Sequence, residues 1–182
     1  MKKFECDYDI KQKWDGLAQH IASVIHNNTD ITILTLFCDL TEVSVYSVYS
    51  LVVKGIKQLI QVFSNSIDAT FGDMIAKKEI ENLNKKFNIY EVIYLALCSF
   101  IFSCAMILIE PFVMVYTYGI LDANYSRVLF GYLIVISEYI WAIRLPYNSI
   151  VLAAGHFKET MKGAWLEAIV NIVLSIMFVA NY

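Results

Sequence analysis

Five long apolar stretches follow one another along the chain, separated by short polar gaps. The clearest contains 18 consecutive uncharged residues, Val92–Ile109, which as a helix would be about 27 Å long. That length is close to the hydrocarbon thickness of a bilayer. The pattern predicts an all-α integral membrane protein, a single transmembrane region over residues 1–182. The expected spans are Leu17–Cys38, Val43–Ile67, Ile89–Ile109, Val128–Ala153 and Gly163–Ala180, with a short polar helix at Ala76–Phe87 between the second and third.

Basic residues are concentrated in every second gap between these spans. Ten of them precede the first span, separate the second from the third or separate the fourth from the fifth: Lys2, Lys3, Lys11, Lys13, Lys77, Lys78, Lys85, Lys86, Lys158 and Lys162. The alternate gaps, Asp39–Glu42 and Pro111–Ser126, contain neither lysine nor arginine. By the positive-inside rule, this distribution predicts a multi-pass protein with a cytoplasmic N-terminus.

Composition agrees with a membrane location. Hydrophobic residues make up 58% and charged residues 17% of the chain, against roughly 45–50% and 25% in soluble domains. The net charge of −3 argues against a nucleic-acid partner, which calls for a basic patch. The four cysteines are scattered without a C-x-x-C pair, so we expect neither a disulfide framework nor a metal site. We also expect no cofactor.

A polar stripe runs along the second span. On a helical wheel its members fall within about 60° of one line: Ser47, Ser50, Lys54, Lys57, Gln58, Gln61, Asn65, Asp68 and Gly72. Apolar residues occupy the other side. Two lysines near mid-span each cost roughly 2.5–3.5 kcal/mol on insertion scales unless they face water, protein or an anion.

Two interpretations of this stripe compete. The helix could lie on the membrane surface with its lysines in solvent, or it could span the membrane and line a hydrated, cationic cavity. The spanning interpretation fits better, because the flanking gaps differ in charge. Lys54 and Lys57 would then meet an anionic group such as phosphate, with Gln58, Gln61 and Asn65 beside them.

The first span has a polar centre that contains His26 and Asp30. These residues are four apart and share a helical face, so they could relay a proton or form a structural pair between packed helices. The fifth span carries Glu167 and Asn171, again four apart. Asn171 suits hydrogen bonding between helices, and Glu167 lies close enough to the cytoplasmic end to be interfacial.

The fourth span carries Glu138, Arg144 and Pro146. Proline kinks a helix because it removes one backbone hydrogen bond. Broken helices at membrane depth are typical of transporters, where irregular backbone lines a cavity, although a simple packing kink is equally compatible with the sequence.

Taken in order, the chain resembles the Wzx-type polysaccharide flippases of the multidrug/oligosaccharidyl-lipid/polysaccharide exporter superfamily. Three stretches carry the resemblance. The first combines HNNTDI at His26–Ile31 with VSVYSVY at Val43–Tyr49, and the second is FGDMIA at Phe71–Ala76, similar to a glycine-led cytoplasmic turn. The third and most specific is AAGHFKET at Ala153–Thr160, continued by EAIVNIVLS at Glu167–Ser175.

The resemblance implies the first five helices of the second bundle in a two-bundle, MATE-like fold. The chain is then expected to be a fragment or a split half, with a separate chain supplying the missing bundle. The implied activity is the movement of undecaprenyl-diphosphate-linked oligosaccharide across the bacterial cytoplasmic membrane by alternating access. Lys54, Lys57 and Arg144 are candidates for binding the diphosphate or acidic sugars. Candidates for ion coupling are His26, Asp30, Glu138 and Glu167.

Three other functions remain open. A multidrug or cation exporter of the same superfamily would share the fold, but an acidic cavity would suit a cation better than the lysine-bearing stripe on the second span. A non-transporting membrane interaction module would assemble with a partner half. A membrane enzyme is disfavoured because the sequence lacks H-E-x-x-H, G-x-S-x-G and Asp-rich metal motifs.

Overall fold

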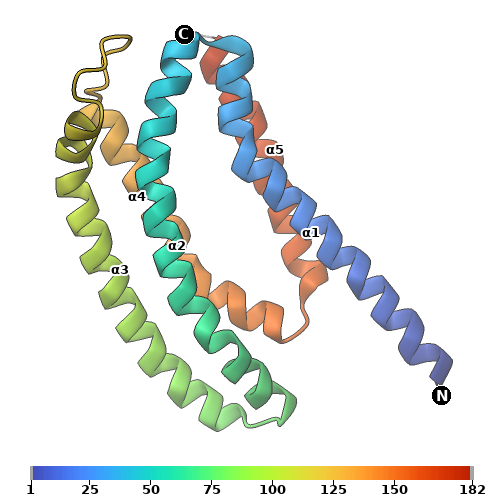
Figure 1. The fold of residues 1–182 in the computed structure, drawn as a ribbon. Helices are drawn as coiled ribbons and strands as arrows, with labels where there is room; N and C mark the ends of the chain where they lie inside the picture. Colours follow the sequence, from blue (N-terminus) through green and yellow to red (C-terminus); the bar gives the residue numbers. More distant parts are fainter. Residues whose placement is uncertain (1, 181–182) are drawn as a thin grey trace. The chain divides into compact units, whose positions relative to one another are not determined.

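The computed structural model describes the backbone of residues 2–180, and their side chains except at 2–13, 15, 19, 26, 157–159, 179 and 180. Its helices are α1 (Lys2–Phe37), α2 (Leu40–Ala76), α3 (Ile80–Tyr116), α4 (Val128–Ala153) and α5 (Phe157–Ala180) (Figure 1). Residues 2–180 contain no β-strand. The predicted all-α fold with five long helices is therefore confirmed.

The separate polar helix expected at Ala76–Phe87 is absent, and that prediction was wrong. Ala76 is the last residue of α2, residues 77–79 form a turn, and residues 80–87 belong to the start of α3. Lys78 adopts a left-handed conformation (φ 58°). The N–H of Lys78 donates to the Ile75 carbonyl and that of Glu79 to the Met74 carbonyl, which is the Schellman arrangement that closes a helix.

Two further boundaries differ from expectation. Gly72, expected to begin the turn that closes the second helix, lies inside α2. Pro111, expected to begin a polar gap, lies inside α3, which continues to Tyr116. The loop between α3 and α4 is therefore shorter than the sequence suggested.

Among the described residues, three helical segments are long and apolar enough to cross a membrane: Ile80–Tyr116, Val128–Ala153 and Thr160–Phe178. They correspond to the third, fourth and fifth expected spans and support a membrane location. α2 has the length but is too polar to be counted with them. The expected first span includes Gln19 and His26, whose side chains lie outside the described residues. Membrane crossing by α1 and α2 stays a prediction.

The chain divides into two compact units. α1, α5 and the first residues of α2 form one unit, and Ser44–Ala154 forms the other. Within the first unit α1 packs along α5, where Ala22, Ile33 and Ala168 are buried. Most of the large apolar side chains of α5 stay exposed, as expected of a helix that faces lipid.

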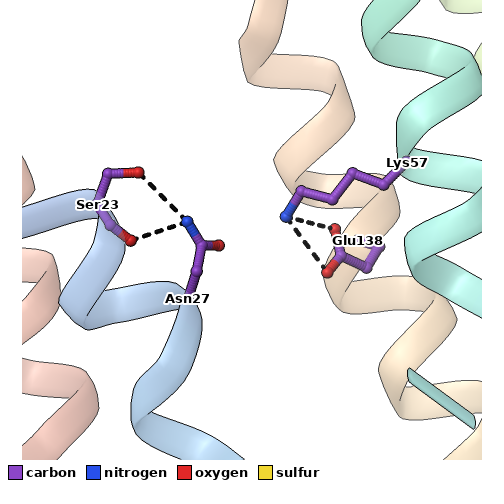
Figure 2. A network of polar contacts seen from close by, with 4 residues as sticks. All are labelled: Ser23, Asn27, Lys57 and Glu138. Carbon is purple, nitrogen blue, oxygen red and sulfur yellow. Dashed lines mark hydrogen bonds and ion pairs between the residues drawn. The ribbon is translucent and has the colours of Figure 1, made fainter. Parts of the chain in front are cut away.

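The polar centre of α1 is helical and bonds to its own backbone. The side chains of Asn28, Thr29, Thr32 and Thr35 each donate to the carbonyl four residues earlier. The amide of Asn27 does the same to Ser23 at 2.8 Å (Figure 2). Such bonds satisfy polar side chains locally, so these residues need no partner from another helix.

The core of the second unit lies between α2, α3 and α4. Its buried members from α2 are Val45, Tyr49, Val53 and Ile60. They pack with eight from α3 and α4, namely Tyr94, Cys98, Phe102, Ala105, Ile109, Val113, Val135 and Ala142. This is the unit that holds the candidate site described below.

Gly131 on α4 lies directly against the ring of Tyr49 on α2. A Cβ atom placed there would lie 2.9 Å from Cε1 of Tyr49, whose ring is fully buried. We expect Gly131→Ala to lower the free energy of unfolding by about 1 kcal/mol, because overpacking exceeds the helix-propensity gain of alanine. Unfolding in detergent, followed by circular dichroism, measures this.

The matched control for Gly131 is Gly72→Ala on α2, where no atom lies within 4 Å of the added Cβ. This substitution should raise stability by roughly 0.5–1 kcal/mol, as it does in unobstructed helices. Equal effects of the two substitutions would show that α2 and α4 are not as close as the structure has them.

Candidate functional site

Three different faces run along α2. One packs into the core of the second unit through Tyr49, Val53 and Ile60. A second exposes large apolar side chains, among them Leu59 and Val62. The third is the polar stripe identified in the sequence, and most of its residues are exposed. Packing within the unit therefore leaves most of the polar stripe unburied, and its exposed side chains are available to contact another molecule or another part of the chain.

Of the predicted site residues on this stripe, Lys54, Gln58, Gln61 and Asn65 are exposed. Lys54 has no ion-pair partner among the described residues. Its ammonium group is consequently the uncompensated positive charge in the middle of α2.

Lys57 differs from Lys54 because it lies where the stripe meets α4. Its Nζ atom is 3.2 Å from Oε2 of Glu138 and 3.5 Å from Oε1, as Figure 2 shows. Nζ also lies 4.1 Å from the ring centroid of Trp141, within the range of a cation–π interaction. Both charged side chains are only 21% exposed. The structure thus joins two residues for which the sequence suggested separate roles.

The remaining predicted residues lie elsewhere. Arg144 is exposed on α4. Asp30 on α1 and Glu167 on α5 are half-buried and belong to the first unit. The side chain of His26 lies outside the described residues, so the proposed His26–Asp30 relay stays a prediction.

A second polar cluster, centred on Glu110, was not predicted from the sequence. The hydroxyl of Tyr49 donates to Oε2 of Glu110 at 2.6 Å, with the Tyr125 carbonyl as a second acceptor at 2.9 Å. The same hydroxyl accepts the backbone N–H of Arg127 at 3.0 Å. Ser126 donates to Oε1 of Glu110 at 2.5 Å. These contacts fasten the α3–α4 loop to α2 and α3.

One signal in the sequence could have pointed to Glu110. It is an isolated acidic residue directly after the apolar run Val92–Ile109, where a carboxylate needs donors nearby. Its donors come from residues 16 and 61 positions away, and no local pattern reveals such pairings. In the same loop, burial and a hydrogen bond to Asp122 raise the pKa of Tyr125 above its ordinary value.

A row of aromatic rings packs near the ends of α2, α3 and α4 that lie away from the α3–α4 loop. Phe71 contacts both Phe87 and Tyr90, and Phe87 contacts Tyr147. The hydroxyl of Tyr147 donates to Oε1 of Glu91. At the nearby turn, the ion pair with Asp73 raises the pKa of Lys77. These contacts join α2, α3 and α4 structurally, and they place no charge on the polar stripe.

An apolar pocket of about 380 Å³ lies between α3 and α4. It is lined mainly by apolar side chains, and its polar atoms include the hydroxyls of Ser99 and Tyr139, which bond to each other at 2.9 Å. The pocket offers no charged group. Among the described residues, no group of histidine, cysteine, aspartate or glutamate side chains is arranged to hold a metal ion.

Comparisons of the chain with protein-family models, curated proteins and solved structures gave no match. The feature best suited to bind a ligand is the α2 polar stripe, in which Lys54 is exposed and Lys57 is paired with Glu138.

Proposed function

We propose that this chain is the membrane part of a polysaccharide exporter, contributing helices to a Wzx-type, MATE-like flippase. The cargo is an undecaprenyl-diphosphate-linked oligosaccharide, moved across the bacterial cytoplasmic membrane by alternating access. Binding of the cargo is the direct test of this proposal.

The observation that carries the proposal is the exposed polar stripe of α2. Its neighbours α3 and α4 are apolar enough to cross a membrane, while α2 keeps Lys54, Gln58 and Gln61 outside the core. A helix with amides and a cation on one face suits a ligand with hydroxyl groups and an anionic headgroup.

The charge of the stripe favours an anionic cargo over a cationic one. Lys54 is exposed and has no ion-pair partner among the described residues. Glu138, which contacts the middle of α2, is already paired with Lys57. A drug or cation exporter would need an available carboxylate at this depth, so the cation exporter is the weaker proposal.

The proposed orientation places the N-terminus and the α2–α3 turn on the cytoplasmic side. Lys77, Lys78, Lys85 and Lys86 at this turn are all exposed, and the loop at the other end of α3 has acidic Asp122 between residues 117 and 126 without a basic residue. This distribution supports the orientation through the positive-inside rule.

A binding measurement with Lys54→Gln tests the proposal. With the full chain in nanodiscs, undecaprenyl diphosphate should bind at least about tenfold more weakly to Lys54→Gln, because a charge-assisted contact is lost. The control is Lys86→Gln, which removes an exposed lysine from the start of α3 and should leave affinity unchanged. Equal affinities of wild type and Lys54→Gln would contradict the role of the stripe.

A further inference from the structure

We propose that Glu138 is a built-in competitor for the anionic ligand, holding Lys57 until the ligand's phosphate takes its place. The inference deepens the proposed function and rests on it. It assigns the two lysines of α2 different roles: Lys54 makes the first contact, and Lys57 is released only when an anion displaces the carboxylate.

The geometry of the Lys57 ammonium group supports this inference. Among the described residues it contacts the Glu138 carboxylate at 3.2 Å and the Trp141 ring at 4.1 Å. The ring fixes the ammonium group in place without neutralising it, whereas the carboxylate neutralises it. Once the Glu138 carboxylate moves away, the ammonium group of Lys57 would remain in place as a partly desolvated cation. Such a cation attracts a phosphate strongly.

The exposure of the pair makes exchange feasible. Each side chain is 21% exposed, so the pair as a whole is partly accessible at the boundary of the polar stripe. Lys54 lies one turn away on the same stripe and is exposed. A ligand with two phosphate groups could contact Lys54 with one and approach Lys57 with the other.

The competition also has a physical purpose. Two unpaired lysines on α2 would be costly in a membrane, and a permanent anion site would release its cargo slowly. With Glu138 as a substitute anion, Lys57 is neutralised before loading and after release. Competition of this kind makes ligand and carboxylate mutually exclusive, so each weakens the other by the same factor.

The first experiment measures binding of undecaprenyl diphosphate to the full chain in nanodiscs for wild type, Glu138→Gln, Lys57→Gln and the double variant. Glu138→Gln should bind on the order of tenfold more tightly, a typical coupling. In the Lys57→Gln background the same change at Glu138 should have no such effect. Undecaprenol tests whether the diphosphate is needed, and inorganic diphosphate tests whether the lipid is.

The second experiment uses Trp141 as a reporter and leaves the pair intact. Trp14→Phe and Trp165→Phe, both in the first unit, leave Trp141 as the single tryptophan, with Lys57 over its ring. Undecaprenyl diphosphate should change its emission with the same concentration dependence as binding, and undecaprenol should not. This measurement stays informative if Glu138→Gln is too unstable to study.

The outcomes separate the two proposals. If undecaprenyl diphosphate binds and Lys54→Gln weakens it, while Glu138→Gln binds no more tightly and Trp141 emission is unaffected, the competition is refuted and the proposed function stands. If wild type binds undecaprenyl diphosphate no better than undecaprenol, the proposed function fails and the competition fails with it.

Discussion

Lys57→Gln should lower the free energy of unfolding of the second unit by about 3 kcal/mol. The substitution leaves the Glu138 carboxylate, only 21% exposed, without its partner. Breaking a buried ion pair by removing one charge typically costs 3–5 kcal/mol, and the remaining solvent access places this pair near the lower end. The cation–π contact with Trp141 is lost at the same time.

The double variant Lys57→Gln/Glu138→Gln should recover most of that loss and unfold within about 1 kcal/mol of wild type, because no charge is left unpaired. The unfolding free energies of the four proteins in detergent form a double-mutant cycle that isolates the pair. The control is Lys85→Gln, whose pair with Glu81 is largely exposed and should contribute about 0.3–0.5 kcal/mol.

Two results would contradict this account of the pair. If Lys57→Gln cost no more than Lys85→Gln, the Lys57–Glu138 contact would be a solvated surface pair. If the double variant were as unstable as Lys57→Gln alone, the stability would come from the packing of the lysine stem and not from its charge.

The sequence predicted the helices well where apolar runs are long. The fourth span was expected at Val128–Ala153, and α4 has these bounds, because Arg127 and Gly155 interrupt the apolar pattern on each side. The polar residues before Ile89 were misassigned to a separate helix. Polarity marks where a helix leaves the membrane, but the backbone continues as a helix until a turn such as the one at Lys78 closes it.

The site was only partly predictable for a related reason. Helical periodicity located the α2 polar stripe, since residues on one face recur at fixed spacing. It could not reveal that Lys57 contacts Glu138, 81 residues later, or that Tyr49 belongs to a polar cluster. Tyr49 falls on the packing face of α2 as an apolar residue would, and only the fold shows that its hydroxyl reaches Glu110 and the α3–α4 loop.

Tyr49→Phe should destabilise the second unit by roughly 2–3 kcal/mol although it removes a single oxygen atom. The ring is fully buried and would stay packed against Phe130, so the loss is confined to the hydroxyl. That hydroxyl donates to the Glu110 carboxylate and accepts the Arg127 N–H. A hydrogen bond to a charged group contributes about 1.5–3 kcal/mol, and a buried partner left unsatisfied adds to the cost.

The matched control for Tyr49→Phe is Tyr118→Phe in the α3–α4 loop. The side chain of Tyr118 is 91% exposed, so stability should change by less than about 0.5 kcal/mol.

Because the Tyr49 hydroxyl fastens the α3–α4 loop, Tyr49→Phe should also speed proteolysis between residues 117 and 127, while the α2–α3 turn is cleaved at the wild-type rate. Unfolding in detergent and limited proteolysis measure the two effects. Lower stability with unchanged loop cleavage would show that Glu110 and Ser126 hold the loop without Tyr49, and unchanged stability would refute the role assigned to the hydroxyl.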